Sequence, residues 1–147
     1  MPLTLADLTS RTGLDVLDHL EREAAIPVTG HLQAQGDLIV IPAEMINTVN
    51  LLPYVRWRPV PPEGVELVRG VAGNNPHTLV ADPGTCHVTT AFQDRLGLTI
   101  AILDNTAPAY LVHPEHGASG IAPGHWLVRR QQESTLGGRA MRMLIAD

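Results

Sequence analysis

The spacing of hydrophobic residues changes near residue 26 of the chain. Before that point, leucines recur three or four residues apart, as on one face of a helix. Thr4 followed by Asp7 is an N-cap signal, and Gly13 interrupts the apolar spacing before Leu14. The sequence therefore predicts a helical segment within residues 1–25, made of two short helices on either side of Gly13.

From residue 26 onward, short apolar runs are separated by Gly, Pro, Asn and Asp, which is the pattern of an antiparallel β domain. We expect a mainly β fold over residues 26–147, either a small barrel or a sandwich of about eight to ten mostly antiparallel strands. The predicted strands cover residues 28–33, 38–41, 65–69, 78–81, 87–92, 98–103, 109–113, 126–131 and 141–146.

Residues 52–64 contain four prolines, and a proline has no N–H group to donate to a sheet. This segment is therefore predicted to be an extended arm or a surface loop. Its apolar side chains, Tyr54, Val55, Trp57 and Val60, suit contact with a neighbouring subunit, and packing against the chain's own β domain is the alternative. Because exposed sheet edges must be covered, we expect a homo-oligomer.

The charge of the chain argues against nucleic-acid and membrane partners. The 147 residues carry a formal net charge of -5, whereas nucleic-acid binding depends on Lys and Arg that neutralise phosphates. The spacing around Gly13 also fits a helix-turn-helix, but Asp15, Asp18 and Glu21 follow where a recognition helix would contact bases. No apolar run approaches the roughly 18 residues of a membrane span. We expect no nucleic-acid or membrane partner.

Cys86 is the only cysteine, so no disulfide can form within the chain. A lone cysteine is typical of a reducing compartment, and the N-terminal residues lack the long apolar core of a signal peptide. We therefore expect a cytoplasmic protein. Cys86 precedes His87, but adjacent side chains on a strand diverge, so we expect a buried thiol in preference to a nucleophilic pair.

Three of the seven histidines lie where a site can form. His77 begins a predicted strand, and His113 and His116 flank Pro114 and Glu115 at the end of another. On an extended backbone His113 and Glu115 point the same way, so with His77 they could form a face of two histidines and one carboxylate for a divalent transition metal. If the chain bends early, His116 replaces Glu115 as the ligand.

Two other interpretations of these residues stay open. Histidines at strand ends often only hydrogen-bond to the backbone, and His113 or His116 could instead act as a metal-free acid or base. The remaining histidines have no neighbouring ligand at metal spacing and are expected at the surface or in the core: His19, His31, His87 and His125.

No complete catalytic template is present. The chain has no GxSxG motif, no phosphate-binding loop, no GxGxxG after a strand and no lysine. We therefore expect a non-enzymatic structural or assembly protein that forms a homo-oligomer and needs no cofactor. The alternative is a cupin-like metal-binding module or metal-dependent enzyme that uses His77, His113, Glu115 and His116.

Four blocks of the sequence resemble an uncharacterised family of small β-rich proteins from bacteria and phages. The blocks are QGDLIVIP (35–42), ELVRG (66–70), residues 74–82, and HPEHGASGIAPGHWLVRRQQE (113–133). The resemblance implies a bacterial or phage cytosolic β protein and links His77, His113, Glu115 and His116 as one unit. The chain departs from the family pattern at Asn75, where a histidine is common, and at Gln132, where arginine is usual.

Overall fold

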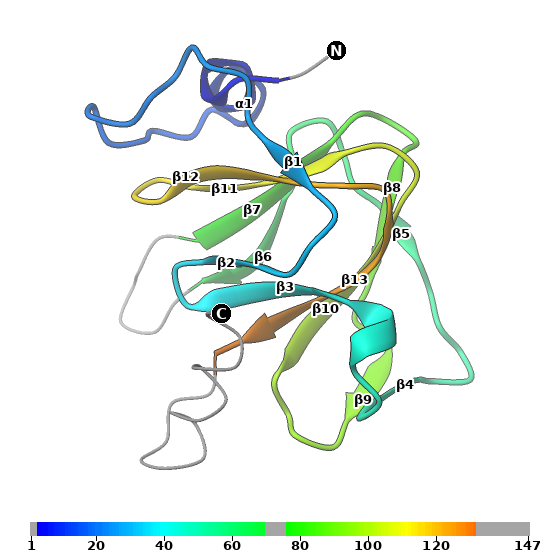
Figure 1. The fold of residues 1–147 in the computed structure, drawn as a ribbon. Helices are drawn as coiled ribbons and strands as arrows, with labels where there is room; N and C mark the ends of the chain where they lie inside the picture. The colour runs from blue at the N-terminus through cyan, green and yellow to red at the C-terminus, as the bar shows by residue number, and fades with distance from the viewer. Residues whose placement is uncertain (1–2, 70–75, 132–147) are drawn as a thin grey trace.

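The computed structural model describes residues 3–69 and 76–131, which form two β-sheets that face each other (Figure 1). The first sheet has five strands, in the order β1 (Val28–Thr29), β12 (Gly117–Ile121), β11 (Ala109–His113), β7 (Pro76–Ala81) and β6 (Val65–Arg69). The second has six, in the order β2 (Gln33–Gln35), β3 (Leu38–Pro42), β13 (Gly124–Arg130), β10 (Thr99–Asn105), β8 (Cys86–Thr89) and β5 (Arg58–Pro59).

All strand pairs in these sheets are antiparallel except β1 with β12. A mainly β fold with mostly antiparallel strands is therefore confirmed, and the sandwich is the alternative that the structure shows. Neither sheet closes into a barrel within the described ranges. A two-stranded sheet of β4 (Val49–Leu51) and β9 (Phe92–Asp94) lies outside the sandwich.

The central core lies between the two large sheets. Leu38 and Val40 of β3 belong to this core, whereas Ile39 and Ile41 belong to a second cluster on the outer face of the six-stranded sheet. The five-stranded sheet alternates in the same way, because Leu111 faces the core and the neighbouring Val112 faces outward. Side chains on both faces are buried, so the strands are almost continuously hydrophobic.

Two short elements cover the outer faces. The helix α1 (Leu5–Thr12) buries Leu5 and Leu8 against the five-stranded sheet, at the top of Figure 1. The 3₁₀ helix η1 (Ala43–Met45) and the β4–β9 pair lie over the six-stranded sheet at the other end. None of the helices in the described residues has the length and hydrophobicity needed to cross a bilayer.

The N-terminal helix begins as predicted, because Thr4 and Asp7 form a reciprocal capping box. The second predicted helix is wrong: residues 14–25 form loops and turns. Gly13 ends α1 in the left-handed conformation at φ 71°. The guanidinium of Arg22 then donates to four main-chain carbonyls, which stabilises the irregular path; they belong to Val16, Leu17, Asp18 and Leu20.

The proline-rich segment 52–64 packs against its own domain. β5 pairs with β8, and Val60, only 3% exposed, lies in the central core. The side chain of Val60 is therefore covered within the chain itself, as in the alternative that the segment packs against its own β domain. Trp57 is half-buried against the outer cluster of Ile39 and Ile41, whereas Tyr54 is 90% exposed.

The strand count exceeds the prediction, since thirteen strands lie in the described residues. The extra strands are short or rich in small residues, and β12, with the sequence GASGI, gives no hydrophobic alternation. The predicted strand 28–33 divides into β1 and β2. Residues 141–146 lie outside the described part of the chain.

Candidate functional site

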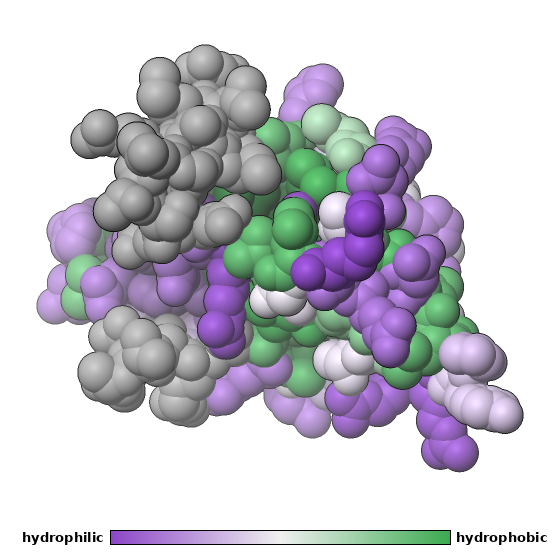
Figure 2. Space-filling view, turned by 90° about the horizontal axis from the view of Figure 1, so that it is seen from below, coloured by the Kyte–Doolittle hydropathy of each residue, from purple (hydrophilic) through white to green (hydrophobic). Residues whose placement is uncertain are grey.

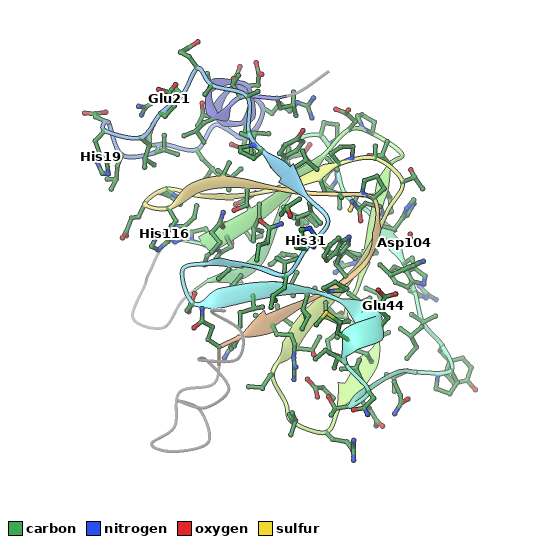
Figure 3. The ribbon with its side chains drawn as sticks, viewed as in Figure 1. His19, Glu21, His31, Glu44, Asp104 and His116 are labelled. Carbon is green, nitrogen blue, oxygen red and sulfur yellow. The ribbon has the colours of Figure 1, made fainter. Side chains whose placement is uncertain are left out.

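Three chain segments that are distant in sequence meet at one end of the sandwich. They are the turn between β2 and β3, the start of β7 and the turn between β11 and β12. His77 lies near the start of β7, and His113 is the last residue of β11. His116 lies in the following turn, on the same side of the molecule as the β2–β3 turn (Figure 3). These positions bring polar groups together beside the sandwich core.

The three histidine rings lie side by side. The ring centroid of His113 is 4.5 Å from that of His77 and 4.6 Å from that of His116. His77 and His113 are buried, at 3% and 6% exposure, while His116 is exposed. Glycine at position 36 allows this packing, since a Cβ there would lie only 2.9 Å from Cδ2 of His116.

Gln35 fixes the orientation of the His77 ring. The amide nitrogen of Gln35 donates to the carbonyl oxygen of Leu111 at 2.8 Å and to Oγ of Ser119 at 3.1 Å. Because a carbonyl oxygen can only accept, the Gln35 side chain must present its own oxygen to His77. Nδ1 of His77 lies 2.9 Å from that oxygen, so Nδ1 carries a proton and donates it.

The other ring nitrogen of His77 faces a carboxylate. Nε2 of His77 lies 3.2 Å from Oδ1 of Asp37, whose side chain is 74% exposed. In the neutral ring with Nδ1 protonated, Nε2 carries a lone pair. Two lone pairs would then face each other, so this contact requires a cation between the two groups: a proton, on Nε2 or on the carboxylate, or a metal ion.

The surroundings of His77 disfavour the proton. Burial lowers the pKa of His77 below its usual value, and the His113 and His116 rings lower it further, while the hydrogen bond and charge of Asp37 oppose these effects. The net shift is downward, which favours the neutral form of the ring.

His113 supports the turn. Its Nδ1 accepts hydrogen bonds from the backbone N–H groups of Glu115 at 3.1 Å and His116 at 3.3 Å. Nδ1 therefore has no proton, and in the neutral ring the proton is on Nε2. A ring in this tautomer cannot coordinate a metal through Nε2, so the geometry assigns His113 a structural role in this conformation.

The prediction that His77, His113 and Glu115 form one face assumed that the strand continues through residue 115. Glu115 lies in the three-residue turn after β11, so the strand alternation behind that prediction does not apply to it. Within residues 3–69 and 76–131, no three or more His, Cys, Asp or Glu side chains are arranged to hold a metal ion. The structure instead brings Asp37 and His116 to His77.

Gln35 and Asp37 are the members of the cluster that the sequence prediction missed. Both flank Gly36 in the QGD block. This block predicts a turn, but it does not predict that the turn lies beside His77, which is 40 residues away from Asp37 in the sequence.

The histidines outside the cluster agree with expectation in being exposed or half-buried: His19, His31, His87 and His125. Cys86 is a buried free thiol whose pKa is raised to about 12, by burial and by Asp104.

The fold and site together define a β-sandwich domain with a Gln–His–Asp arrangement beside two further histidines. Residues 34–131 match the family described as "Domain of unknown function (DUF8820)", and the chain belongs to this family. The matched region contains every residue of the site. No curated protein and no solved structure matches the chain.

Proposed function

We propose that this protein is a metal-binding module that holds a divalent transition metal between Nε2 of His77 and the carboxylate of Asp37. The supporting observation is that Nε2 of His77 lies 3.2 Å from Oδ1 of Asp37, while Nδ1 of the same ring lies 2.9 Å from the side-chain oxygen of Gln35. Histidine ligands of metals usually donate their second ring N–H to such an outer partner, which fixes the tautomer. Imidazole and carboxylate suit zinc, iron, nickel or manganese.

His116 is the proposed third ligand. It lies next to the turn that carries Asp37, since a Cβ at Gly36 would lie 3.0 Å from Nε2 of His116 and 3.4 Å from Cε1 of His77. His116 and Asp37 are both exposed, so their side chains can change rotamer at little cost and turn toward an ion. Water would complete the coordination, as in sites with few protein ligands.

The test is titration of the purified, metal-stripped protein with Zn²⁺ in a calorimeter. We expect one ion per chain, and at least about tenfold weaker binding in each of the variants Asp37→Asn and His77→Gln. His116→Ala is expected to weaken binding less, because the first two ligands remain. Equal binding by wild-type protein and Asp37→Asn would refute the proposal.

A surface histidine–carboxylate pair provides the control. Nδ1 of His125 lies 3.7 Å from Oδ1 of Asp104, and both side chains are substantially exposed. Neither belongs to the histidine cluster. Asp104→Asn should therefore leave the zinc affinity unchanged, and a matching loss in this variant would indicate general surface binding.

A second candidate function is assembly into a homo-oligomer, for which the exposed apolar side chains at the end of β4 and directly after it are the specific support. Leu51 is 50% exposed, Leu52 37% and Tyr54 90%. Large apolar side chains that are exposed close together often form protein–protein interfaces. We expect light scattering to give a mass above that of one chain, and Leu52→Asp with Tyr54→Ser to lower it. A monomeric wild-type protein would refute this assignment.

A bacterial or phage origin and a cytoplasmic location also belong to the proposal. They rest on the sequence resemblance and on a single cysteine that is a free thiol. Neither zinc binding nor assembly requires catalysis, so the module is proposed to be non-enzymatic.

A further inference from the structure

A hollow of about 230 Å³ lies on the outer face of the six-stranded sheet, and no residue of the histidine cluster lines it. Most of its lining is aliphatic and comes from Ile39, Ile41, Met45, Ile46, Leu96 and Leu98. Met45 is 59% exposed and Leu96 51%. The side of the molecule seen in Figure 2 carries such exposed hydrophobic residues, in green, among polar ones.

Two arginines of β13, Arg129 and Arg130, also line this hollow. Arg129 is only 7% exposed, and its Nε has no hydrogen-bond partner among the described residues. The ion pair that it forms within residues 3–69 and 76–131 is long, with 3.4 Å between its Nη2 and Oδ2 of Asp94. A guanidinium has five N–H donors, and the one on Nε of Arg129 is left unpaired within this part of the chain.

Asp94 cannot compensate this charge well, because other donors already occupy it. Its Oδ2 accepts from Oγ of Thr99 at 2.6 Å, from N of Thr99 at 2.8 Å and from N of Leu98 at 3.2 Å. Its Oδ1 accepts from Thr48 and Leu96. A carboxylate offers about four acceptor sites, so Arg129 receives only a weak share.

We propose that this hollow binds a small amphiphile with a short aliphatic tail and a carboxylate head. The tail would lie against the aliphatic lining, and the carboxylate would pair with the guanidinium of Arg129, with Arg130 at the exposed rim. Guanidinium and carboxylate form paired, charge-assisted hydrogen bonds that match both groups in geometry. The volume is below the roughly 300–1,000 Å³ of pockets for drug-sized ligands, so the tail is short.

The experiment uses octanoate as the probe and octylammonium as a ligand with the same tail and the opposite charge. Binding to the full chain is measured by calorimetry and by backbone amide NMR shifts. We expect octanoate to bind and to shift amides of β3, β13 and the 94–98 loop, and octylammonium to bind at least about tenfold more weakly. Equal binding of both ligands, or no binding of octanoate, would overturn the proposal.

Two variants separate loss of the site from loss of the fold. Leu96 is about half exposed and lines the hollow, so Leu96→Asp places a carboxylate at its rim. We expect this carboxylate to repel that of octanoate and to weaken octanoate binding at least about tenfold. Leu17→Asp makes the same change at another exposed leucine, which does not line the hollow, and should leave binding unchanged. Equal effects of the two variants would overturn the assignment. Arg129→Lys should bind more weakly than wild type, because lysine lacks the planar fork.

Discussion

Nε2 of His77 and Oδ1 of Asp37 lie 3.2 Å apart, although both are acceptors when the imidazole is neutral with its proton on Nδ1. The Gln35 side chain fixes the tautomer of His77. Its amide nitrogen donates to Leu111, so its oxygen faces Nδ1 of His77 and keeps a proton on that nitrogen. Without that constraint the ring could place its proton toward Asp37 and remain neutral. The argument for a cation between His77 and Asp37 therefore depends on Gln35, although Gln35 would not itself contact the ion.

Replacing Gln35 tests this dependence. Gln35→Leu should lower the free energy of unfolding by about 1–3 kcal/mol, because a buried amide loses its hydrogen bonds and His77 loses its acceptor. It should also weaken zinc binding. Urea denaturation measures the change in the free energy of unfolding. Gln33→Leu is the control on the same strand, since the side-chain amide of Gln33 donates to the carbonyl of Gly120, whereas that of Gln35 faces the His77 ring; equal effects on zinc affinity would contradict the account.

Gly36 tests the position of His116. Its φ of +58° costs a non-glycine residue roughly 1–2 kcal/mol, and an added Cβ would displace the His116 ring. Gly36→Ala should therefore reduce stability and also change the ring signals of His116 in NMR spectra. Gly84 has φ +79° with no atom within 4 Å of an added Cβ. Gly84→Ala should reduce stability alone, and unchanged His116 signals in Gly36→Ala would contradict the proposed packing.

The carboxylate of Asp94 should make stability depend on acidic pH. Burial acts to raise the pKa of Asp94, but hydrogen bonds from Thr99, Leu96 and Thr48 outweigh it and hold the pKa far below the usual 3.8. The ionised group therefore stabilises the fold above about pH 3.8, and this contribution is lost as the pH falls. Asp94→Asn should cost about 2–4 kcal/mol at pH 7.

The difference between Asp94→Asn and wild-type protein should narrow progressively in denaturation experiments at decreasing pH below 3.8. A difference that stays constant down to pH 2 would show that the loss comes from packing alone.

Cys86 should be chemically inert in the folded protein. It is 1% exposed, and its pKa is raised to about 12 by burial and by Asp104, so little thiolate forms at pH 8. We expect iodoacetamide to modify it only as fast as the domain opens, and rapidly in urea. Mass spectrometry over time measures both rates. Fast modification under native conditions would contradict the buried position.

The sequence predicted the main strands well because their side chains are hydrophobic on both faces. Strand β12 was missed since glycine and alanine give no alternation, although Gly120 must be small there: an added Cβ would lie 2.6 Å from the carbonyl oxygen of Pro27. The leucines after Gly13 indicated a helix, yet Leu14 and Leu20 pack from loops.

The site was predicted in part for a similar reason. The sequence analysis selected His77, His113 and His116 as candidate site residues because histidine can bind metals, and the structure brings their rings together. The partners of each ring depend on strand register and turn geometry. Register places Gln35 against the carbonyl of Leu111, 76 residues away, and no local pattern encodes that contact.

NMR of protein labelled with ¹⁵N-histidine tests the central claim most directly, because the shifts of Nδ1 and Nε2 report the protonation and metal binding of each ring. Without metal at pH 7.5, His77 should show a protonated Nδ1 and an unprotonated Nε2, and one equivalent of Zn²⁺ should shift Nε2 while Nδ1 stays protonated. His113 should keep its proton on Nε2. A His77 ring that is protonated on both nitrogens and unchanged by Zn²⁺ would show that the pair with Asp37 is a simple ion pair, and would contradict the account.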